Sequence, residues 1–504
     1  MHSKPCGFLR DKIQQNRSAV LLVLYCMLTS GIILTICSMC SPLYPFNQHW
    51  DVNCFVTVAR GVQRGMIPYR DLVEQKGPLW YYMHALVLAV FPGRFFGIFV
   101  WEWISMTFSL YFMYRIAKLY LPKVNVGWLT VLTAVVCASH MFVAGDMCEE
   151  LCLPFMLYSL YAGLRSLRGE KILRLRDYVL HGFLAGCVMF IKINLLGIHF
   201  AFMAVLALNA LIREKSLVRV LKMCGCFLLG MLAAILPWII WLGINGALDE
   251  FWDTYIIANG FGYGNRKHSI PVRVILGMLI NMKQNIVFSS VLVLGMASML
   301  AYPNKRMNWM EKLLWLGAFL AMMVFIYMGG VANRYYILAF APFAVLALLP
   351  LALLERVSLS RASSVVATIC LLTAGTAYAY AFSESAPFIG SRFEDMPQAK
   401  VAAYINQSEE HTLLNYCALD NGFYYAADIM PVNRYFCGLN IRRKEIKAEH
   451  DAMVRDGVVK FVITSKVTLE EMTESSDKYK LVMEIEPDGT SRFEKHYYLY
   501  ERKY

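Results

Sequence analysis

The chain has 504 residues, of which 58% are hydrophobic and only 17% are charged. This composition excludes an ordinary soluble enzyme and predicts a polytopic α-helical membrane protein. The net charge is +12, but the basic residues gather in short loops between apolar runs. The charge therefore indicates orientation in a lipid bilayer and not a nucleic-acid partner.

The first predicted element is a membrane span at residues 18–40. A basic stretch, 1–17, precedes this apolar run, and no small-residue cleavage site follows it, so we interpret it as a retained span and not a signal peptide. Apolar runs of comparable length predict about eleven spans in total. They lie near 18–40, 95–119, 124–143, 150–167, 177–193, 195–212, 217–244, 286–303, 312–329, 335–354 and 362–382.

The segment 79–93 is apolar but short, and charge decides how it should be placed. If it crossed the bilayer, the basic loops near 115–123, 165–176 and 213–219 would lie opposite the basic N-terminus. If it lies flat, all these loops share the N-terminal side and obey the positive-inside rule. We therefore predict interfacial helices at 52–64 and 79–93. The N-terminus is then cytoplasmic and the C-terminus extracytoplasmic, in a cell inner or plasma membrane.

This topology places most polar segments on the outer face and divides the chain into two parts. The predicted outer loops are 41–94, 144–149, the region around 194, 245–285 and 330–334. Residues 1–382 form the predicted membrane part, and residues 383–504 form a small extracytoplasmic α/β domain. In that domain we expect helices at 399–405 and 444–455, strands at 413–418, 458–464, 480–486 and 496–501, and a turn at Pro487-Asp488-Gly489.

Fourteen cysteines are scattered through the chain, many of them inside apolar runs, where they act as small hydrophobic residues. Cys148 and Cys152 lie four residues apart, but no histidine cluster accompanies them, and the sequence therefore predicts no metal site. Cys417 and Cys437 could pair if their domain faces an oxidising compartment, and their spacing leaves that question open.

Asp51 follows the first span by about ten residues and precedes an amphipathic stretch at 55–62. A carboxylate that is partly desolvated at a membrane surface has a raised pKa and is a usable general base. The alternative is that Asp51 is the N-cap of a helix, a position where aspartate is favoured. The local sequence leaves both interpretations open.

Three cations fall in separate outer segments. Lys76 precedes a Trp/Tyr cluster at the start of the flat helix, Lys192 ends a span, and Arg334 opens another. Cations that face one exterior pocket would suit a phosphate group. For Lys76 the alternative is simple snorkelling to the headgroup region.

Asp146, Glu149 and Glu150 crowd into one very short outer loop. They could coordinate a divalent cation or bind sugar hydroxyls, and the alternative is a solvated turn. The chain has no Walker motif, G-x-S-x-G elbow or HExxH motif, and acids are nearly absent from the span interiors apart from Glu102. Nucleotide hydrolysis and ion-coupled transport are therefore both disfavoured.

Taken in order, the motifs of the first outer loop resemble the GT-C superfamily of lipid-dependent glycosyltransferases. The closest branch contains the protein O-mannosyltransferases and the lipid A aminoarabinose transferase. The resemblance covers roughly 18–382. It rests on Asp51, on Arg60-Gly61 through Ile67-Pro68-Tyr69-Arg70-Asp71, and on Lys76-Gly77-Pro78-Leu79-Trp80-Tyr81-Tyr82. The chain departs from the family where Val52 replaces a second acid and Gly77 replaces the first of two prolines, so the branch and the sugar stay open.

The resemblance implies transfer, with inversion, of a sugar from a polyprenyl phosphate carrier to an acceptor hydroxyl on the outer face. Asp51 would be the base, and Lys76, Lys192 and Arg334 would bind the donor phosphate. The sugar or the acceptor (a glycan, lipid or protein) would contact Asp146, Glu149, Asn194, Tyr82 and Tyr336. A divalent cation is compatible with this chemistry but not required. The alternative function is a non-catalytic transporter of polyprenyl lipids or polysaccharides, which would need cations along a path through both leaflets.

Overall fold

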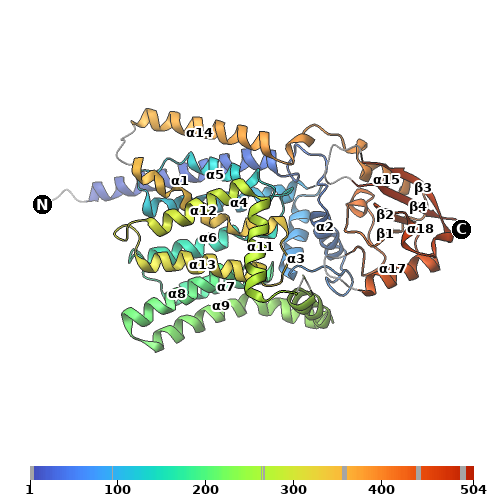
Figure 1. Ribbon diagram of the computed structural model, residues 1–504, viewed down its shortest axis with the longest axis horizontal. Coiled ribbons are helices and arrows are strands. Elements are labelled where there is room, and N and C mark those ends of the chain that lie inside the picture. Colours follow the sequence, from blue (N-terminus) through green and yellow to red (C-terminus); the bar gives the residue numbers. More distant parts are fainter. Residues whose placement is uncertain are drawn as a thin grey trace.

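The computed structural model describes residues 5–93, 95–262, 264, 267–354, 360–438, 444–487 and 495–503. A bundle of long helices makes up most of the molecule, and a small sheet with short helices follows it (Figure 1). Helices α2 (Trp50–Gln63) and α3 (Pro78–Val90) lie between the bundle and this C-terminal region. The chain thus has the α-helical membrane part and the α/β C-terminal part that the sequence predicts, and their boundary at 382/383 stays a prediction.

Every predicted span overlaps a helix of the bundle, although the helix within 124–143 has only 10 residues. The helices are α1 (Pro5–Cys37), α4 (Phe96–Tyr120), α5 (Trp128–Cys137), α6 (Cys148–Leu167), α7 (Leu175–Met189), α8 (Gly197–Glu214), α9 (Leu217–Ile244), α12 (Ile286–Ala301), α13 (Trp309–Tyr327), the 3₁₀ segment η3 (Arg334–Leu354) and α14 (Arg361–Phe382). Among the described residues, seven helices are long and apolar enough to cross a membrane, or eight if α11 and α12 form one bent span. A count of eleven spans therefore stays a prediction.

Helix α3 does not run through the bundle. Its 13 residues make it roughly 20 Å long, which is short for a hydrocarbon core of about 30 Å. Val73, before the helix, donates its backbone N–H to the carbonyl of Arg434 at 2.9 Å. Phe95, after the helix, packs on Tyr425 at a centroid distance of 5.2 Å. The segments on both sides of α3 therefore contact the C-terminal region, and the flat placement of 79–93 on the membrane stays a prediction.

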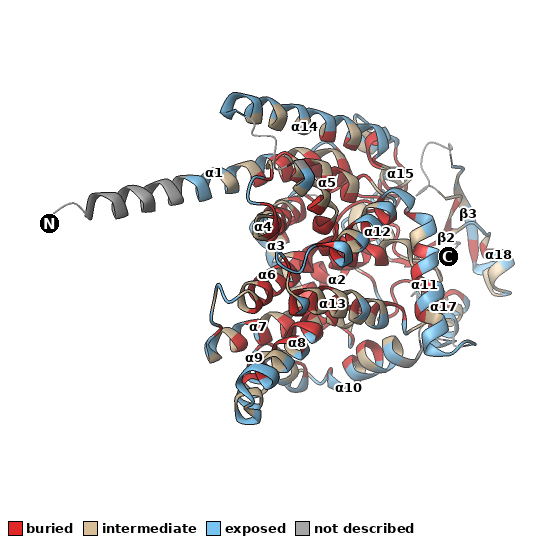
Figure 2. Ribbon diagram, turned by 60° about the vertical axis from the view of Figure 1, so that its left-hand side comes forward, coloured by how far each residue is buried: buried red, intermediate tan, exposed pale blue. Residues whose placement is uncertain are grey.

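The described part of the predicted outer loop 245–285 is largely helical, and its placement outside the membrane stays a prediction. It contains α10 (Leu248–Phe251), the π-helical η2 (Trp252–Gly262) and α11 (Ile270–Gln284), which meets α12 at an angle of 120°. Pro271 at the first turn of α11 favours helix initiation there. One side of α11 is exposed (Figure 2), and polar residues at its end interrupt the apolar run, so hydropathy alone did not reveal it.

The connecting loops separate into two sets at opposite ends of the bundle, as the topology predicts. Asn47 donates to the carbonyl of Ala144 at 3.1 Å, which joins two predicted outer loops. Arg168 donates to the carbonyl of Arg306 at 3.0 Å, which joins two predicted cytoplasmic loops. Which set faces the cytoplasm stays a prediction.

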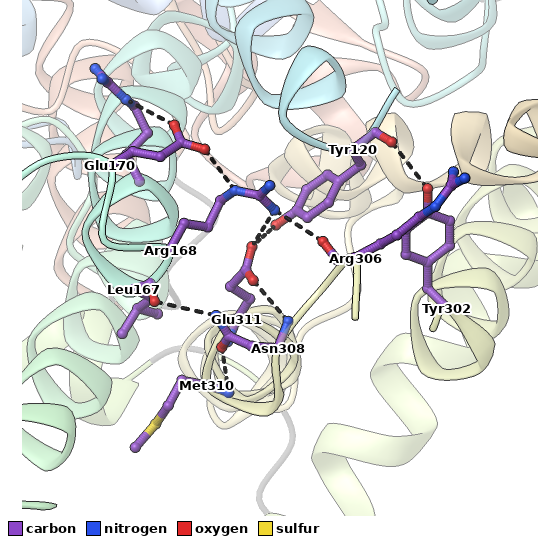
Figure 3. A network of polar contacts seen from close by, with 10 residues as sticks. Tyr120, Leu167, Arg168, Glu170, Tyr302, Arg306, Asn308, Met310 and Glu311 are labelled. Carbon is purple, nitrogen blue, oxygen red and sulfur yellow. Dashed lines mark hydrogen bonds and ion pairs between the residues drawn. The ribbon is translucent and has the colours of Figure 1, made fainter. Parts of the chain in front are cut away.

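A polar network connects several helices at the end of the bundle that carries the predicted cytoplasmic loops (Figure 3). The Glu311 carboxylate accepts hydrogen bonds from Tyr120 at 2.9 Å and from Arg168 at 3.2 Å. Its other oxygen accepts from the backbone N–H of Asn308, at 2.8 Å, and Asn308 caps α13 in return. Because Glu311 is almost fully buried, this carboxylate links α4, the end of α6 and the start of α13.

We expect Glu311→Gln to destabilise the protein by about 1–3 kcal/mol, because a buried carboxylate that receives a charged donor is lost. The measurement is the melting temperature of the detergent-solubilised protein. Glu170→Gln is the matched control, since Glu170 also pairs with Arg168 but its side chain is 40% exposed. Equal melting temperatures for the two variants would contradict the role assigned to Glu311.

The C-terminal region contains the predicted helices and strands, some of them shorter than expected. A four-stranded sheet has the order β1-β2-β4-β3, with β1 parallel to β2 and the other pairs antiparallel. Its elements are η4 (Ala386–Phe388), η5 (Phe393–Asp395), α15 (Pro397–Ile405), β1 (Leu413–Asn415), α16 (Phe423–Ala426), α17 (Lys444–Asp456), β2 (Phe461–Ser465), α18 (Leu469–Met472), η6 (Ser476–Lys478), β3 (Tyr479–Ile485) and β4 (Tyr497–Arg502). Asp488 and Gly489 of the predicted turn lie outside the described residues.

The C-terminal region packs directly on α2. The Arg60 guanidinium donates to the carbonyls of Tyr424 at 3.2 Å and Ile429 at 3.4 Å, and it forms an ion pair with Asp428. Arg60 belongs to the Arg-Gly motif of the first outer loop, so one role of this motif is to dock the C-terminal region.

Candidate active site

Asp51 is the second residue of α2. His49 is the N-cap of that helix, so the interpretation of Asp51 as an N-cap is wrong. The Asn53 side chain fixes the start of the helix by donating to the carbonyls of Asn47 and His49, both at 2.9 Å. Asp51 is only 5% exposed, and within the described ranges its carboxylate has no hydrogen bond or ion pair. A nearly buried carboxylate without a polar partner is poised to accept a proton from a ligand.

Asp51 lines a cavity of about 400 Å³ together with Arg334. The full lining is His49, Trp50, Asp51, Asn333, Arg334, Tyr335 and Leu419. The predicted base and one of the predicted phosphate ligands, which come from opposite halves of the sequence, therefore share one cavity. Leu419 shows that the C-terminal region contributes to the wall.

A hydrogen bond to its backbone carbonyl holds Arg334 in place. Most N–H donors of its guanidinium group therefore stay available for a ligand. Asn285, at the bend between α11 and α12, donates to the Arg334 carbonyl at 3.1 Å. The guanidinium makes a long ion pair of 3.5 Å with Glu384. Since a guanidinium has five N–H donors, it can also bind an anion in the cavity.

Lys192 lies next to the same site. Its ammonium group is paired with Glu149 and stands 5.0 Å from the ring centroid of Tyr335 and 4.6 Å from that of Tyr336. The structure thus brings together three predicted site residues, Lys192, Glu149 and Tyr336, beside Arg334. In the described part of the chain, the second carboxylate oxygen of Glu149 is buried without a hydrogen-bond partner, so this pair could rearrange when an anion arrives.

Lys76 is buried behind α2 and is not among the residues that line the Asp51 cavity. Its ammonium lies 3.7 Å from Glu74 and 4.9 Å from the ring centroid of Phe55. Phe55 follows Asp51 by one helical turn, so Lys76 supports the helix that carries the predicted base. A purely snorkelling role is wrong, because the side chain is enclosed by protein.

The structure explains why Gly77 stands where relatives carry proline. The backbone N–H of Gly77 donates to the carbonyl of Ile191 at 3.0 Å. A Cβ atom at this position would lie 2.0 Å from the carbonyl oxygen of Phe190. Proline lacks the N–H group and would add the clashing carbon, so this close contact with the end of α7 requires glycine.

We expect Gly77→Ala to lower the stability of the protein by about 1–3 kcal/mol, because the added carbon forces two backbone segments apart. The melting temperature of the purified protein should fall accordingly. Gly225→Ala is the matched control, since an added Cβ there meets no atom within 4 Å. If Gly77→Ala melted no lower than Gly225→Ala, the close contact would not matter for stability.

Asp146 is fully buried and engaged, so it is not the solvated turn residue that the sequence allowed. Both its carboxylate oxygens lie 3.0 Å from Nε2 of His84, and its backbone N–H donates to Glu102 at 2.6 Å. Burial raises the pKa of Asp146, and the His84 contact opposes this effect. These contacts hold α3, α4 and the loop before α6 together, which is a supporting role.

Two other predicted contacts also lie outside the cavity lining. Tyr82 packs against α9, with ring-centroid distances of 5.0 Å to Trp238 and 5.1 Å to Trp241. Asn194 lies in the short η1 helix (Ile193–Leu195), and its amide oxygen is buried without a hydrogen-bond partner. The structure therefore does not bring Tyr82 or Asn194 to Asp51.

No sequence pattern indicated a role for Lys495, which lies close to the site. Its ammonium group stands 4.9 Å from the ring centroid of Trp50, and it donates to the Asn421 side chain at 2.9 Å. Burial, with a smaller effect from Lys466, lowers the pKa of Lys495 to about 8. Lys495 lies in the C-terminal tail far along the chain, so only the tertiary structure shows that it neighbours a cavity residue.

Comparison with solved structures finds the same fold in ArnT from Cupriavidus metallidurans. The structure of ArnT bound to undecaprenyl phosphate has a TM-score of 0.57 and 13% sequence identity, and the alignment covers 95% of this chain and 97% of that one. Its apo state has a TM-score of 0.58 and 12% identity, with 96% and 98% covered. The likeness confirms, at the level of the fold, the GT-C resemblance inferred from the motifs.

No curated protein matches the chain in sequence. One family model does match, and its description is "Putative competence-induced protein Ccs4 N-terminal domain". The match extends over residues 12–370, which includes α2, α3, Lys192 and Arg334. The chain therefore belongs to this competence-induced protein Ccs4 family.

Proposed function

We propose that the protein is an inverting membrane glycosyltransferase that moves a sugar from a polyprenyl phosphate carrier to an acceptor hydroxyl at the outer face. The observation that carries this proposal is the cavity shared by Asp51 and Arg334. It pairs a carboxylate that has no partner among the described residues with a cation suited to a phosphate. ArnT of the same fold is bound to undecaprenyl phosphate in its structure, which supports a polyprenyl phosphate carrier here.

The chemistry follows from the positions of the two groups. Asp51 accepts the proton of the acceptor hydroxyl while the hydroxyl oxygen attacks the anomeric carbon of the sugar. The bond between that carbon and the phosphate oxygen breaks on the opposite side, and its electron pair leaves with the phosphate. Arg334 stabilises the charge that develops on the leaving phosphate, and Lys192 assists once it exchanges its contact with Glu149.

The first experiment uses the full chain, purified into lipid, with a panel of polyprenyl phosphate sugars and candidate acceptors. Release of free polyprenyl phosphate, together with sugar on the acceptor, is the expected result. If no donor in the panel is consumed while labelled donor lipid moves between the leaflets of proteoliposomes, the protein is a transporter and not a transferase. The panel also identifies the sugar, which the geometry of the cavity does not specify.

A further inference from the structure

Two cysteines from distant parts of the chain meet beneath the C-terminal region. Cys54 lies on α2, three residues after Asp51, and Cys437 lies in the segment between α16 and α17. Their sulfur atoms are 3.7 Å apart, although 383 positions separate the residues in the sequence. Cys54 is 3% exposed and Cys437 is 1% exposed, so both thiols lie inside the contact between the two parts of the molecule.

The surroundings of this cysteine pair bind the C-terminal region to α2. Thr57, one turn further along α2, donates its hydroxyl to Asp420 at 2.6 Å. The Asp420 carboxylate also accepts from the backbone N–H of Gly422 at 2.8 Å. Leu419, which lines the Asp51 cavity, immediately precedes Asp420. The pair therefore lies beside the segment that forms part of the cavity wall.

The sequence left open whether Cys437 pairs with Cys417, and the geometry points elsewhere. The thiol of Cys417 lies 3.6 Å from Nδ1 of His450, and its backbone N–H donates to the same nitrogen at 3.0 Å. The sulfur of Cys437 faces Cys54 instead.

We propose that Cys54 and Cys437 form a disulfide that fastens the C-terminal region to the helix that carries Asp51. A disulfide has a sulfur–sulfur distance of about 2.05 Å, so the two sulfur atoms must approach each other from the observed contact of 3.7 Å. The inference rests on the extracytoplasmic placement of the C-terminal region, because oxidising compartments maintain disulfides. It does not require that the protein transfers a sugar.

The reaction is thiol–disulfide exchange with an external disulfide oxidant, RSSR. The thiolate of one cysteine attacks RSSR and releases one RSH. The thiolate of the other cysteine then attacks the mixed disulfide, which forms the Cys54–Cys437 bond and releases the second RSH. Together, the two cysteines lose two electrons and two protons, and the two RSH molecules gain these electrons and protons.

Burial determines when this bond forms. The hydrogen bond that the Cys54 thiol makes to Cys437, and then desolvation, raise the pKa of Cys54, and desolvation raises the pKa of Cys437. Because the thiolate is the nucleophile, exchange is slow in the packed protein. The bond should form while the C-terminal region docks on α2, and the finished bond should then resist reductants until the protein is unfolded.

The test is peptide mapping of the full chain isolated from its native membrane, with free thiols alkylated during denaturation. The expected result is a Cys54–Cys437 linked peptide that disappears on reduction and that Cys54→Ser abolishes. Cys417→Ser is the matched control and should retain the link. A parallel sample receives glutathione disulfide during refolding, or in mild denaturant, before alkylation.

Two results would overturn the proposal. One is full alkylation of both Cys54 and Cys437, without prior reduction, in the native and the glutathione-treated samples alike. The other is a link from Cys437 to Cys417 in place of Cys54. Since these readouts are masses of peptides, they are independent of transfer. An active enzyme without the link would reject the disulfide alone, and a linked protein inactive on every donor would reject the proposed function alone.

Discussion

Asp51→Asn is expected to lower the turnover number for sugar transfer by about 10²–10⁴-fold, the usual contribution of a general base. The asparagine has nearly the same shape but cannot accept the proton of the acceptor hydroxyl. Because the Asp51 carboxylate has no protein partner among the described residues, its replacement removes no stabilising contact. The variant should therefore keep the melting temperature of the wild type, and the loss should appear in the chemical step.

Single-turnover kinetics with a preloaded donor lipid would measure this step directly. Asp249→Asn is the matched control, because Asp249 is an exposed carboxylate on α10 outside the cavity. It should transfer at the wild-type rate. Turnover by Asp51→Asn within a few-fold of that rate would exclude Asp51 as the base, and the other residues of the cavity would have to be examined for this role.

Arg334→Gln is expected to lower turnover by about 10²–10³-fold, in line with the loss of one preorganised donor to a developing charge. The guanidinium faces the same cavity as Asp51, and phosphate is the group that departs with negative charge. Arg334→Lys should recover part of the rate, since it restores the charge but not the fork of donors. Comparison of donors with better and worse leaving groups would locate the effect at bond cleavage.

Glu384→Gln is the control for this second experiment. Glu384 makes the only ion pair of Arg334 given by the described part of the structure, at 3.5 Å, so its replacement frees the guanidinium without removing it. Turnover should hold or rise. If Arg334→Gln lost no more activity than Glu384→Gln, Arg334 would not contact the leaving phosphate, and Lys192 would become the principal candidate.

Much of the architecture could be predicted because it depends on local patterns. Long apolar runs mark helices wherever they occur, and ten or more residues of one periodicity specify an element without reference to its neighbours. The flat placement of 79–93, which rests on charge bias, stays a prediction. Hydropathy did not predict the helix at 270–284, because α11 is amphipathic and its polar end interrupts the apolar run.

The site could be predicted only in part. Asp51, Lys192 and Arg334 were found because charged residues at the ends of apolar runs are costly and thus conspicuous. Asp146 carried the same signal, yet the structure buries it against His84. A charged residue in a short loop looks the same in sequence whether it faces a ligand or a buried partner.

By itself, the sequence determined that this is a multi-helix membrane protein with a GT-C-like first loop and an α/β tail. These features could be predicted because hydropathy, charge bias and motif spacing are properties of residues that lie close together in the sequence. Only the tertiary structure decided that Asp51 and Arg334 share one cavity, that Leu419 of the tail lines it, that Lys495 of the tail lies against Trp50, and that Cys437 faces Cys54. Those contacts join segments hundreds of positions apart, and they depend on how whole helices pack, which no local pattern encodes.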